Sequence, residues 1–506
     1  MRIQLVAFIL LLSSVLPLPA QNAATETITI DAAAPAHPFP HYWEQMFGSG
    51  RAILSLRESY RRDLRTVRQT TGFQYVRFHG ILDDDVGVYG EDKQGQPIYN
   101  FSYIDQIYDG LLALGVKPFV EISFMPYKLA SDPNSLQAFS YHPNSSPPKD
   151  YAKWDDLITQ FIKHLVDRYG IDEVAQWYFE VWNEPNLQQT APGADFWTGL
   201  PRQKTYFELY DHTARDIKAA APSLRVGGPA TAQAAWVGDM IRHAEQAHVP
   251  LDFVSTHVYG NDTASDVFHT HENIPRDQMV CRAVKKVHDE IKASSRPDIL
   301  LIWSEYNAAY DNQVDVTDSI YMGPWLATTI AQCDGMTKMM SLWTFSDVFE
   351  EQGVVKTPFY GGFGLMAEGN LPKSSYYALQ VLHRLGEERI ENTNPDVLVT
   401  RSDSGMLTIA VWNIVNPGST GAAKTVKLQF KGVGPEAHVS IRRVDANHGN
   451  TLGLWEKMGS PRYPTQAQLE TLRQESRLPE PDFADLVNGT MTLELPVNGL
   501  AVLQVR

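Results

Sequence analysis

The chain has 506 residues, too many for one average domain, and a barrel of roughly 250 residues or more would leave room for a second module. Its formal net charge is −16, with acidic residues scattered along the chain, which argues against nucleic acid or an anionic membrane as a partner. Aromatic residues make up 11% of the chain, which suits a sugar-binding cleft and a large core equally well.

Residues 1–20 have the pattern of a secretory signal peptide. They carry Arg2, an apolar run from Val6 to Leu12, and a small residue, Ala20, before a polar stretch. The apolar run is too short to span a bilayer, and no other stretch has a transmembrane pattern. We therefore expect cleavage after Ala20 and a secreted or periplasmic protein.

The segment 21–36 holds a first short strand. Thr25 to Asp31 alternates polar and apolar residues, as a half-buried strand does. It comes too early to belong to the repeating units that follow, so we expect it to join a β-sandwich formed by the C-terminal part.

Residues 37–386 alternate strand-like and helical stretches, the rhythm of parallel βαβ units. Eight units can be counted, the last ending in a helix at 374–385, which predicts one (β/α)₈ TIM barrel of the α/β class. A Pro-rich loop at 131–148 follows the third strand, and loops of this length are usually functional or mobile. The first predicted strand ends near Gly50 and the fourth near Asn183. The other six predicted strands cover 74–80, 118–124, 225–229, 253–260, 299–305 and 339–346.

Beyond Gly386 the pattern changes to short alternating strands between Gly, Asn and Pro clusters. A helical rhythm returns only at 464–477. Residues 387–506 are therefore predicted to form a β-sandwich with one small helical insert, packed on the barrel. The predicted strands are 405–412, 424–430, 438–444, 490–495 and 500–505.

The two cysteines, Cys281 and Cys333, both fall in segments predicted as helices. They can pair if those helices are neighbours. The fold should not depend on that bond.

Glu184 and Glu305 each follow an apolar, Trp-containing strand. The carboxyl ends of barrel strands form the catalytic face, and hydrolysis of a glycosidic bond requires two carboxylates on one face. Capping of the next helix is the simpler interpretation of Glu184 alone, but the repeated arrangement argues against it. Apolar neighbours would raise the pKa of Glu184, as a general acid needs.

Four motifs occur in order: Arg-Phe-His-Gly at 77–80, Trp-Asn-Glu-Pro at 182–185, Thr-His-Val-Tyr-Gly at 256–260 and Trp-Ser-Glu-Tyr-Asn at 303–307. Together they resemble glycoside hydrolase family 39, which contains β-xylosidases and α-L-iduronidases. Asn-Glu-Pro alone would indicate only the clan. Further agreement at 361–365, 372–373 and 443–445 extends the resemblance over nearly all of the mature chain.

The resemblance implies a retaining mechanism, in which the two carboxyl groups lie about 5–5.5 Å apart. Glu184 would protonate the leaving oxygen and later deprotonate water. Glu305 would attack the anomeric carbon and form a covalent glycosyl-enzyme, so hydrogen-bond donors should keep it ionised.

Four further residues are candidates for substrate binding. Asn183 is suited to donate to the sugar 2-hydroxyl, although it could merely cap the turn. His257 and Tyr259 end the sixth strand, where a satisfied core histidine is an equal interpretation of the residues alone. The resemblance implies that Tyr259 holds the nucleophile, that His257 lies close to the acid, and that His79 binds a sugar hydroxyl.

Two loops are acidic. The segment 345–351 resembles the family loop that supplies a carboxylate to ring hydroxyls; we favour Glu350, with Glu351 as the rival, and expect one of them only at the surface. Asp83 to Asp85 is predicted to be a solvated loop, although one of its residues could line the cleft.

Trp343, and also Trp182 or Phe124, could form the floor under the apolar face of the sugar, but each is also a plausible core residue. Arg77 is expected to form an ion pair with a barrel carboxylate rather than to contact substrate. The sequence has no zincin spacing, phosphate-binding loop or Ser-nucleophile elbow, so neither a metal nor a cofactor is expected.

The residues and the resemblance favour a retaining exo-glycosidase, a β-D-xylosidase that releases xylose from small oligosaccharides. An α-L-iduronidase would need Lys or Arg to hold a substrate carboxylate, whereas the strand-end loops are acidic and Lys356 is the candidate base. Two further hypotheses are a β-glycosidase of the same clan that acts on another sugar and a catalytically silent carbohydrate-binding protein. The loop 131–148 could shape an exo pocket within one subunit or within an oligomer.

Overall fold

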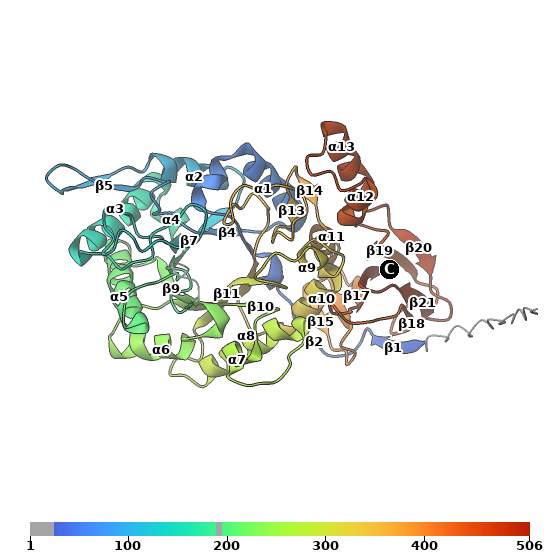
Figure 1. The fold of residues 1–506 in the computed structure, drawn as a ribbon. Coiled ribbons are helices and arrows are strands. Elements are labelled where there is room, and N and C mark those ends of the chain that lie inside the picture. Colours follow the sequence, from blue (N-terminus) through green and yellow to red (C-terminus); the bar gives the residue numbers. More distant parts are fainter. Residues whose placement is uncertain (1–24, 189–194) are drawn as a thin grey trace, which may run out of the picture.

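The computed structural model describes residues 25–188 and 195–506, so the predicted signal peptide at 1–20 lies outside the described residues. A ring of helices around a barrel stands beside a smaller, strand-rich C-terminal unit (Figure 1). Within the described ranges, no helix combines the length and the hydropathy needed to cross a membrane.

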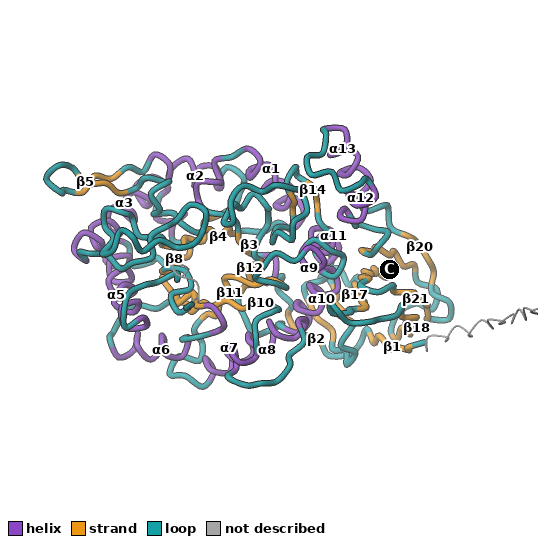
Figure 2. Tube along the Cα trace, in the orientation of Figure 1, coloured by secondary structure: helices purple, strands orange, loops and turns teal. Residues whose placement is uncertain are grey.

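Eight parallel strands close into a barrel in their sequence order, which confirms the predicted (β/α)₈ fold. Figure 2 shows these strands inside the ring of helices. Each strand lies where the sequence placed it, with ends that differ by a few residues. The strands are β3 (Met46–Gly48), β4 (Tyr75–Phe78), β7 (Lys117–Ile122), β8 (Tyr178–Val181), β9 (Arg225–Thr231), β10 (Phe253–Tyr259), β11 (Leu300–Asn307) and β12 (Met339–Leu342).

The helices cover the barrel with one apolar stripe each. In α3 (Tyr151–Tyr169), apolar residues recur every three or four positions from Trp154 to Leu165 and are buried, and the Asp150 side chain caps the first turn. The other main helices are α1 (Glu58–Thr71), α2 (Ser102–Leu112), α5 (Arg202–Ala220), α6 (Val237–Gln246), α8 (Arg276–Lys292), α10 (Met322–Gln332) and α11 (Ser374–Leu382), with short α4 (Ile171–Val174), α7 (Ala264–Phe268) and α9 (Val314–Thr317) between them.

The barrel interior has an apolar floor and a polar layer above it. Side chains alternate between the two faces of a strand, so residues two positions beyond the floor also point inward. The polar layer of Arg77, Glu121 and Glu180 therefore separates the floor from the barrel mouth. The floor consists of Met46, Phe119, Tyr178, Phe253, Ile302 and Met339.

Two sheets face each other across a second apolar core, as predicted for the C-terminal unit. The strands β2, β15, β16 and β20 and the helix α12 were not predicted from the sequence. One sheet contains β1 (Glu26–Asp31), β18 (Lys424–Lys431) and β21 (Thr490–Leu495). The other contains β2 (Ala36–Pro38), β15 (Glu388–Ile390), β16 (Val397–Arg401), β17 (Leu407–Asn413), β22 (Gly499–Val505), β19 (His438–Val444) and β20 (Asp482–Asp485). The helices α12 (Thr451–Lys457) and α13 (Gln466–Glu475) pack against the β13–β14 hairpin (residues 366–372), where the C-terminal unit meets the barrel.

Strand β1 runs parallel to β18, with Glu26 opposite Val426. Strand β2 pairs with β15, so the sandwich includes residues up to Pro38, slightly beyond the predicted boundary at 36. Trp412 and Leu500 of the sandwich belong to the same apolar cluster as the barrel helices. The two units therefore share a packed interface.

The helix α8 is joined to the end of α10 by a disulfide between Cys281 and Cys333. The predicted condition for pairing, that the two helices are neighbours, is therefore met. The small hairpins β5 (Tyr89–Glu91) with β6 (Pro97–Tyr99), and β13 (Met366–Ala367) with β14 (Leu371–Pro372), lie outside the barrel sheet.

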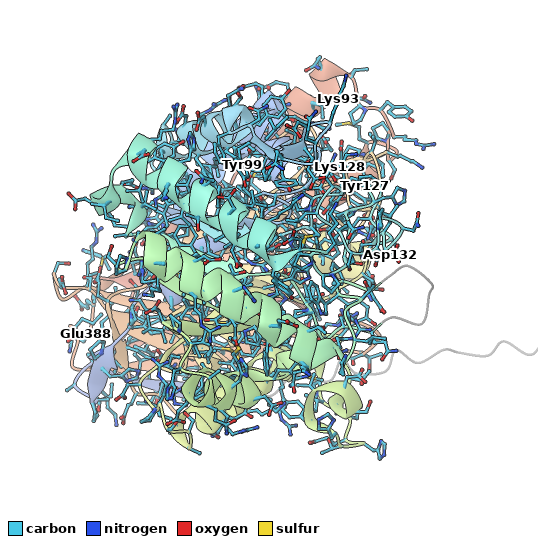
Figure 3. All side chains as sticks on the ribbon, turned by 90° about the vertical axis from the view of Figure 1, so that its left-hand side faces the viewer. Lys93, Tyr99, Tyr127, Lys128, Asp132 and Glu388 are labelled. Carbon is cyan, nitrogen blue, oxygen red and sulfur yellow. A yellow bond between two sulfur atoms is a disulfide. The ribbon has the colours of Figure 1, made fainter. Side chains whose placement is uncertain are left out.

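The loop that follows β7 lies at the strand carboxyl ends. Figure 3 shows its residues Tyr127, Lys128 and Asp132 on the opposite side of the molecule from Glu388, which begins β15. The carboxyl-end face, rather than the side that carries β15, is therefore where the barrel loops can build a site.

Candidate active site

Glu184 lies on a turn just beyond β8. Trp182 and Glu184 both have positive φ angles, 71° and 45°, which are uncommon for residues other than glycine. Neighbouring contacts hold this turn: the Glu184 amide donates to the Ala230 carbonyl at 2.8 Å, and the Trp182 indole donates to the Phe196 carbonyl at 2.7 Å. The carboxyl group is thus fixed at the barrel mouth.

Glu305 reaches the mouth because of a β-bulge. Strand β10 pairs Thr256 with Trp303 and then His257 with Glu305, so Ser304 is an extra residue on β11. Trp303 packs outward against the helices, and regular alternation would send Glu305 to the same outer face. The bulge reverses this and turns Glu305 inward.

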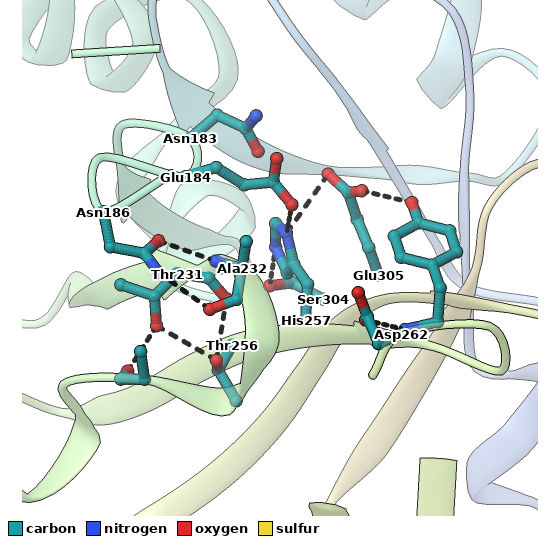
Figure 4. A network of polar contacts seen from close by, with 12 residues as sticks. Asn183, Glu184, Asn186, Thr231, Ala232, Thr256, His257, Asp262, Ser304 and Glu305 are labelled. Atoms are coloured by element: carbon teal, nitrogen blue, oxygen red, sulfur yellow. Dashed lines mark hydrogen bonds and ion pairs between the residues drawn. The ribbon is translucent and has the colours of Figure 1, made fainter. Parts of the chain in front are cut away.

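The two carboxylates meet at the mouth, as predicted. One oxygen of each and a ring nitrogen of His257 all lie within 4.8 Å of one another. His257 Nδ1 is 3.0 Å from Glu184 Oε1 and 3.6 Å from Glu305 Oε1, and Figure 4 shows the imidazole between the two carboxylates. This short separation is that of a retaining pair of carboxylates.

Both oxygens of Glu305 accept hydrogen bonds. Tyr259 Oη donates to Oε2 at 2.7 Å, and Arg77 Nη1 donates to Oε1 at 2.6 Å. A phenol and a guanidinium at these positions stabilise an ionised carboxylate. The predicted placement of Tyr259 beside the nucleophile is confirmed.

The surroundings of Glu184 favour its protonated form. Burial first, and then the negative charge of Glu305, raise the pKa of Glu184 well above its ordinary value. Burial, with the charges of Arg77 and His79, lowers the pKa of His257, so this imidazole is neutral and brings no positive charge to offset the carboxylates. The environment therefore suits Glu184 to act as a proton donor.

Beneath the mouth, Arg77 links three carboxylates. Besides Glu305, it donates through Nη2 to Glu121 at 2.8 Å and through Nε to Glu180 at 2.5 Å. Burial would raise the pKa of Glu121, but the charges of Arg77 and His79 outweigh it and leave that pKa lowered. Arg77 thus forms the predicted ion pairs. Glu121 and Glu180 were not predicted, although a carboxylate inside an apolar strand was a usable signal.

A cavity of about 450 Å³ opens above the pair, a size typical of small-ligand sites. It is lined by five of the six predicted substrate-binding residues: His79, Asn183, His257, Tyr259 and Trp343. Its wall also contains Phe139, Leu187, Phe196, Asp262, Tyr310 and Phe363, which sequence analysis did not single out.

Asn183 and His79 each have one polar atom bound to the protein. The Asn183 Oδ1 accepts from Arg77 at 2.9 Å, which leaves its NH₂ group available to donate. His79 Nδ1 lies 2.7 Å from Glu121, and since a carboxylate only accepts, Nδ1 carries the proton and Nε2 is left for another partner.

Trp343 lies against Gly48 of β3. A Cβ atom at position 48 would stand 2.2 Å from the Trp343 ring, so only glycine leaves space for the indole. Trp343 therefore forms part of the cavity wall, whereas Trp182 and Phe124, the other aromatic candidates, are fully buried and do not line the cavity.

The preference for Glu350 over Glu351 is corrected by the structure. Glu350 Oε2 accepts from Arg57 at 3.0 Å, and Glu350 does not line the cavity. Glu351 does line it, and its Oε1 is 3.6 Å from His79 Nε2. Glu350 has a positive φ of 63°, and this turn presents the following side chain to the mouth.

The prediction of a solvated loop at Asp83 to Asp85 is wrong for Asp83. Its side chain is buried, whereas Asp84 is exposed. Arg51 donates to Asp85 at 2.8 Å, so the loop is tied down by an ion pair. None of the three residues lines the cavity.

A second buried ionic cluster supports the cavity wall from outside. Lys373 Nζ lies 2.5 Å from Asp318 and 2.6 Å from Asp347, and all three side chains are fully buried. The two aspartates also accept from the amides of Gly361 and Gly364, at 2.6 and 2.7 Å. The cluster therefore fixes the loop that carries Phe363.

Two groups among the described residues have ligand atoms near enough to hold a metal ion: Glu184, His257 and Glu305, and separately His41, Glu44 and His383. In the first group, Arg77 and Tyr259 already occupy hydrogen-bonding positions of Glu305. That arrangement suits proton transfer and nucleophilic attack by the carboxylates.

The model of glycosyl hydrolases family 39 matches residues 26–482. The chain belongs to this family. It is 38% identical to a β-xylosidase of Geobacillus stearothermophilus over 444 residues, 86% of either chain. It superposes on a monomeric β-xylosidase of Caulobacter crescentus with a TM-score of 0.84, at 32% identity and covering 95% of this chain and 99% of the other. Human α-L-iduronidase is 23% identical over 59% of this chain and 46% of its own.

Proposed function

We propose that this family 39 hydrolase is a retaining β-D-xylosidase that releases xylose from the ends of xylo-oligosaccharides. The observation that carries the proposal is the pairing of Glu184, whose pKa is raised, with Glu305, whose oxygens are both hydrogen-bonded, within 4.8 Å at the mouth of one cavity. The 38% identity to a β-xylosidase supports the choice of sugar.

In the first step, Glu305 attacks the anomeric carbon while Glu184 gives its proton to the glycosidic oxygen, so that the alcohol leaves and a glycosyl-enzyme ester forms. In the second step, the ionised Glu184 takes a proton from water, and the water oxygen displaces Glu305 from the same carbon. Two inversions return the original anomeric configuration. The free NH₂ group of Asn183 is placed to donate to a ring hydroxyl throughout.

The cavity favours a neutral sugar over a uronic acid. Glu184, Asp262, Glu305 and Glu351 line it, and no Lys or Arg does so among the described residues. The segment 189–194, which lies outside that part, contains neither residue type. Lys356, the candidate base for an iduronidase, is exposed and absent from the lining. A substrate carboxylate would therefore be repelled at this site.

The loop 131–148 supports action at chain ends. It brings Phe139 into the cavity wall. The amide of Ser140 donates to the Glu351 carbonyl at 2.7 Å, and its hydroxyl donates to the Glu350 carbonyl at 2.6 Å. The loop thus docks on the segment after β12, which narrows the mouth toward a pocket for a terminal residue.

Hydrolysis of aryl β-xyloside, β-glucoside, β-arabinoside and α-L-iduronide by the wild type and Glu305→Ala tests this function. We expect the β-xyloside to be cleaved fastest by the wild type, and proton NMR of the first product to show the β anomer. Product sizing on xylo-oligosaccharides should show xylose from the first turnovers. An initial α anomer contradicts the retaining mechanism, and binding without any cleavage supports a silent carbohydrate-binding protein.

We further propose that the protein is exported to the periplasm or the medium. The support is the pattern of residues 1–20 in the sequence. N-terminal sequencing of the protein recovered from its source tests this, and a chain that still begins at Met1 in the cytoplasmic fraction contradicts it.

A further inference from the structure

A second cavity, of about 500 Å³, lies where the barrel, the sandwich and the helical insert meet. Its residues come from α1, the β13–β14 hairpin, α11, β19, and α13 with the segment that follows it, and Figure 1 shows α11 and α13 at this junction. It shares no lining residue with the catalytic cavity. The wall carries four arginines, Arg384, Arg442, Arg473 and Arg477.

The charge of this cavity is opposite to that of the whole chain. Acidic residues outnumber lysine and arginine by 59 to 43 in the sequence, yet Glu480 is the one carboxylate among the described residues that line this cavity. The cavity is therefore a local region of positive charge on an acidic protein, of the kind that attracts anions.

Three of the four guanidinium groups have no hydrogen-bonding partner among the described residues. Arg473 is occupied, because it donates to the Gly369 carbonyl at 2.6 Å and to Glu470 at 3.2 Å. The side chains of Arg384, Arg442 and Arg477 make no hydrogen bond or ion pair with any residue in the described ranges. Their donors are therefore available to a ligand.

Two of these arginines also repel each other. Burial, followed by the charge of Arg442, lowers the pKa of Arg384. Arg384 is exposed and Arg442 is partly buried, and neither has a carboxylate as a hydrogen-bonding partner in the described part of the chain, so their positive charges add at the mouth of this cavity.

The rest of the wall offers little competition for these donors. The hydroxyl groups of Tyr376 and Tyr377 are already bonded to Thr70 and Ser476, at 2.6 and 2.9 Å. The tyrosines thus contribute their rings, and Glu480 is the one charged acceptor that a ligand would meet among the described lining residues.

We propose that this cavity binds a small oxyanion, a carboxylate or phosphate group, through the guanidinium groups of Arg384, Arg442 and Arg477. The planar fork of arginine matches both groups, because it donates two parallel hydrogen bonds to a pair of oxygens. The ligand can be inorganic phosphate or the carboxylate of an acidic sugar. The proposal does not depend on the reaction at Glu184 and Glu305.

Isothermal titration at constant ionic strength, with potassium phosphate, potassium glucuronate or potassium chloride as titrant, tests the proposal. The key variant is Arg384→Gln with Arg442→Gln. The matched control is Arg215→Gln with Arg282→Gln, which removes the same charge from two exposed arginines outside the cavity. We expect one-to-one, saturable binding to the wild type and the control, and binding weaker by about tenfold or more in the key variant.

The two anionic titrants distinguish the two kinds of ligand. Binding of phosphate alone supports an inorganic oxyanion, binding of glucuronate alone supports an acidic sugar, and binding of both supports the shared chemistry. No saturable binding of either, or equal affinity in the wild type and the key variant, overturns the proposal.

Thermal unfolding without added anion provides a second readout. Removal of both charges of the repelling pair should leave Tm of the key variant equal to, or above, that of the wild type, and hydrolysis of aryl β-xyloside should be unchanged. A clear fall in Tm of the key variant, absent from the control, means that these arginines stabilise the fold itself, and this also overturns the proposal.

Discussion

The protein contains two buried ionic clusters, and they differ in their exposure to the catalytic cavity. The cluster around Arg77 opens onto the catalytic cavity through Glu305, whereas the cluster around Lys373 is closed, with every side chain fully buried. Both have more carboxylates than cations. In the closed cluster, Lys373 contacts both aspartates and the backbone amides of Gly361 and Gly364 also donate to them, although burial still raises the pKa of both aspartates.

In the open cluster, the surplus of negative charge is left facing the cavity. Glu184 and Glu351 have no cation of their own there, and burial together with the charge of Glu305 raises the pKa of each. The same residue types therefore give a structural brace where a cation and backbone amides contact the carboxylates, and a proton donor where the carboxyl group faces the cavity without them.

The largest effect should come from the open cluster. Glu305→Gln removes the nucleophile but keeps its shape, so kcat for aryl β-xylosides should fall by about 10⁴-fold or more. Circular dichroism should show an unchanged fold. Retention of more than a few per cent of wild-type kcat means that another group attacks the sugar.

Glu184→Gln should slow substrates with poor leaving groups by about 10²–10⁴-fold and activated aryl xylosides much less, because only the former need the proton. In the wild type, kcat/KM should fall as pH rises through the raised pKa of Glu184, since the acid form is lost. This alkaline limb should disappear in the variant. Equal losses on both kinds of substrate contradict the assignment of the acid.

Breaking the closed cluster should instead reduce stability. Lys373→Met leaves Asp318 and Asp347 buried without their cation, so the free energy of unfolding in urea should fall by about 3–5 kcal/mol. Lys356→Met, at an exposed lysine, is the matched control and should change it by about 0.5 kcal/mol or less. If the two variants unfold alike, the cluster does not brace the loop.

The smallest effect concerns the two adjacent glutamates after β12. Glu351→Gln should raise KM for β-xylosides by about tenfold, because the carboxyl group loses a hydrogen bond to the sugar that the amide does not reproduce, and Glu350→Gln should leave KM unchanged. Because its pKa is raised, the stability that protonated Glu351 contributes is lost as pH rises through that pKa. The Gln variant should not show this loss. A larger KM change for Glu350→Gln reverses the assignment.

The sequence predicted the features that depend on regular patterns. Eight strands, the barrel and the carboxylates of Glu184 and Glu305 at strand ends follow from apolar runs that stop at polar residues. The contact of Tyr259 with Glu305 came from the family resemblance. These features are repeated along the chain or formed by neighbouring residues, so they can be predicted from the sequence alone.

The remaining features depend on irregular backbone. The bulge at Ser304 makes Glu305 point inward, and the residue type at position 304 does not predict a bulge. The left-handed turn at Glu350 decides which of two neighbouring glutamates reaches the cavity. The position of Phe139 depends on how a long loop docks on a segment 210 residues away in the chain.

The pairing of β1 with β18 makes the sandwich a discontinuous domain, with the whole barrel inserted between its first strands and the rest. During synthesis, the barrel can be completed before the partner strand of β1 has been made. Residues 26–31 therefore have no strand to pair with until the segment around position 426 has been synthesised. A truncation past Asp31 would leave the edge of β18 open to pairing with another chain.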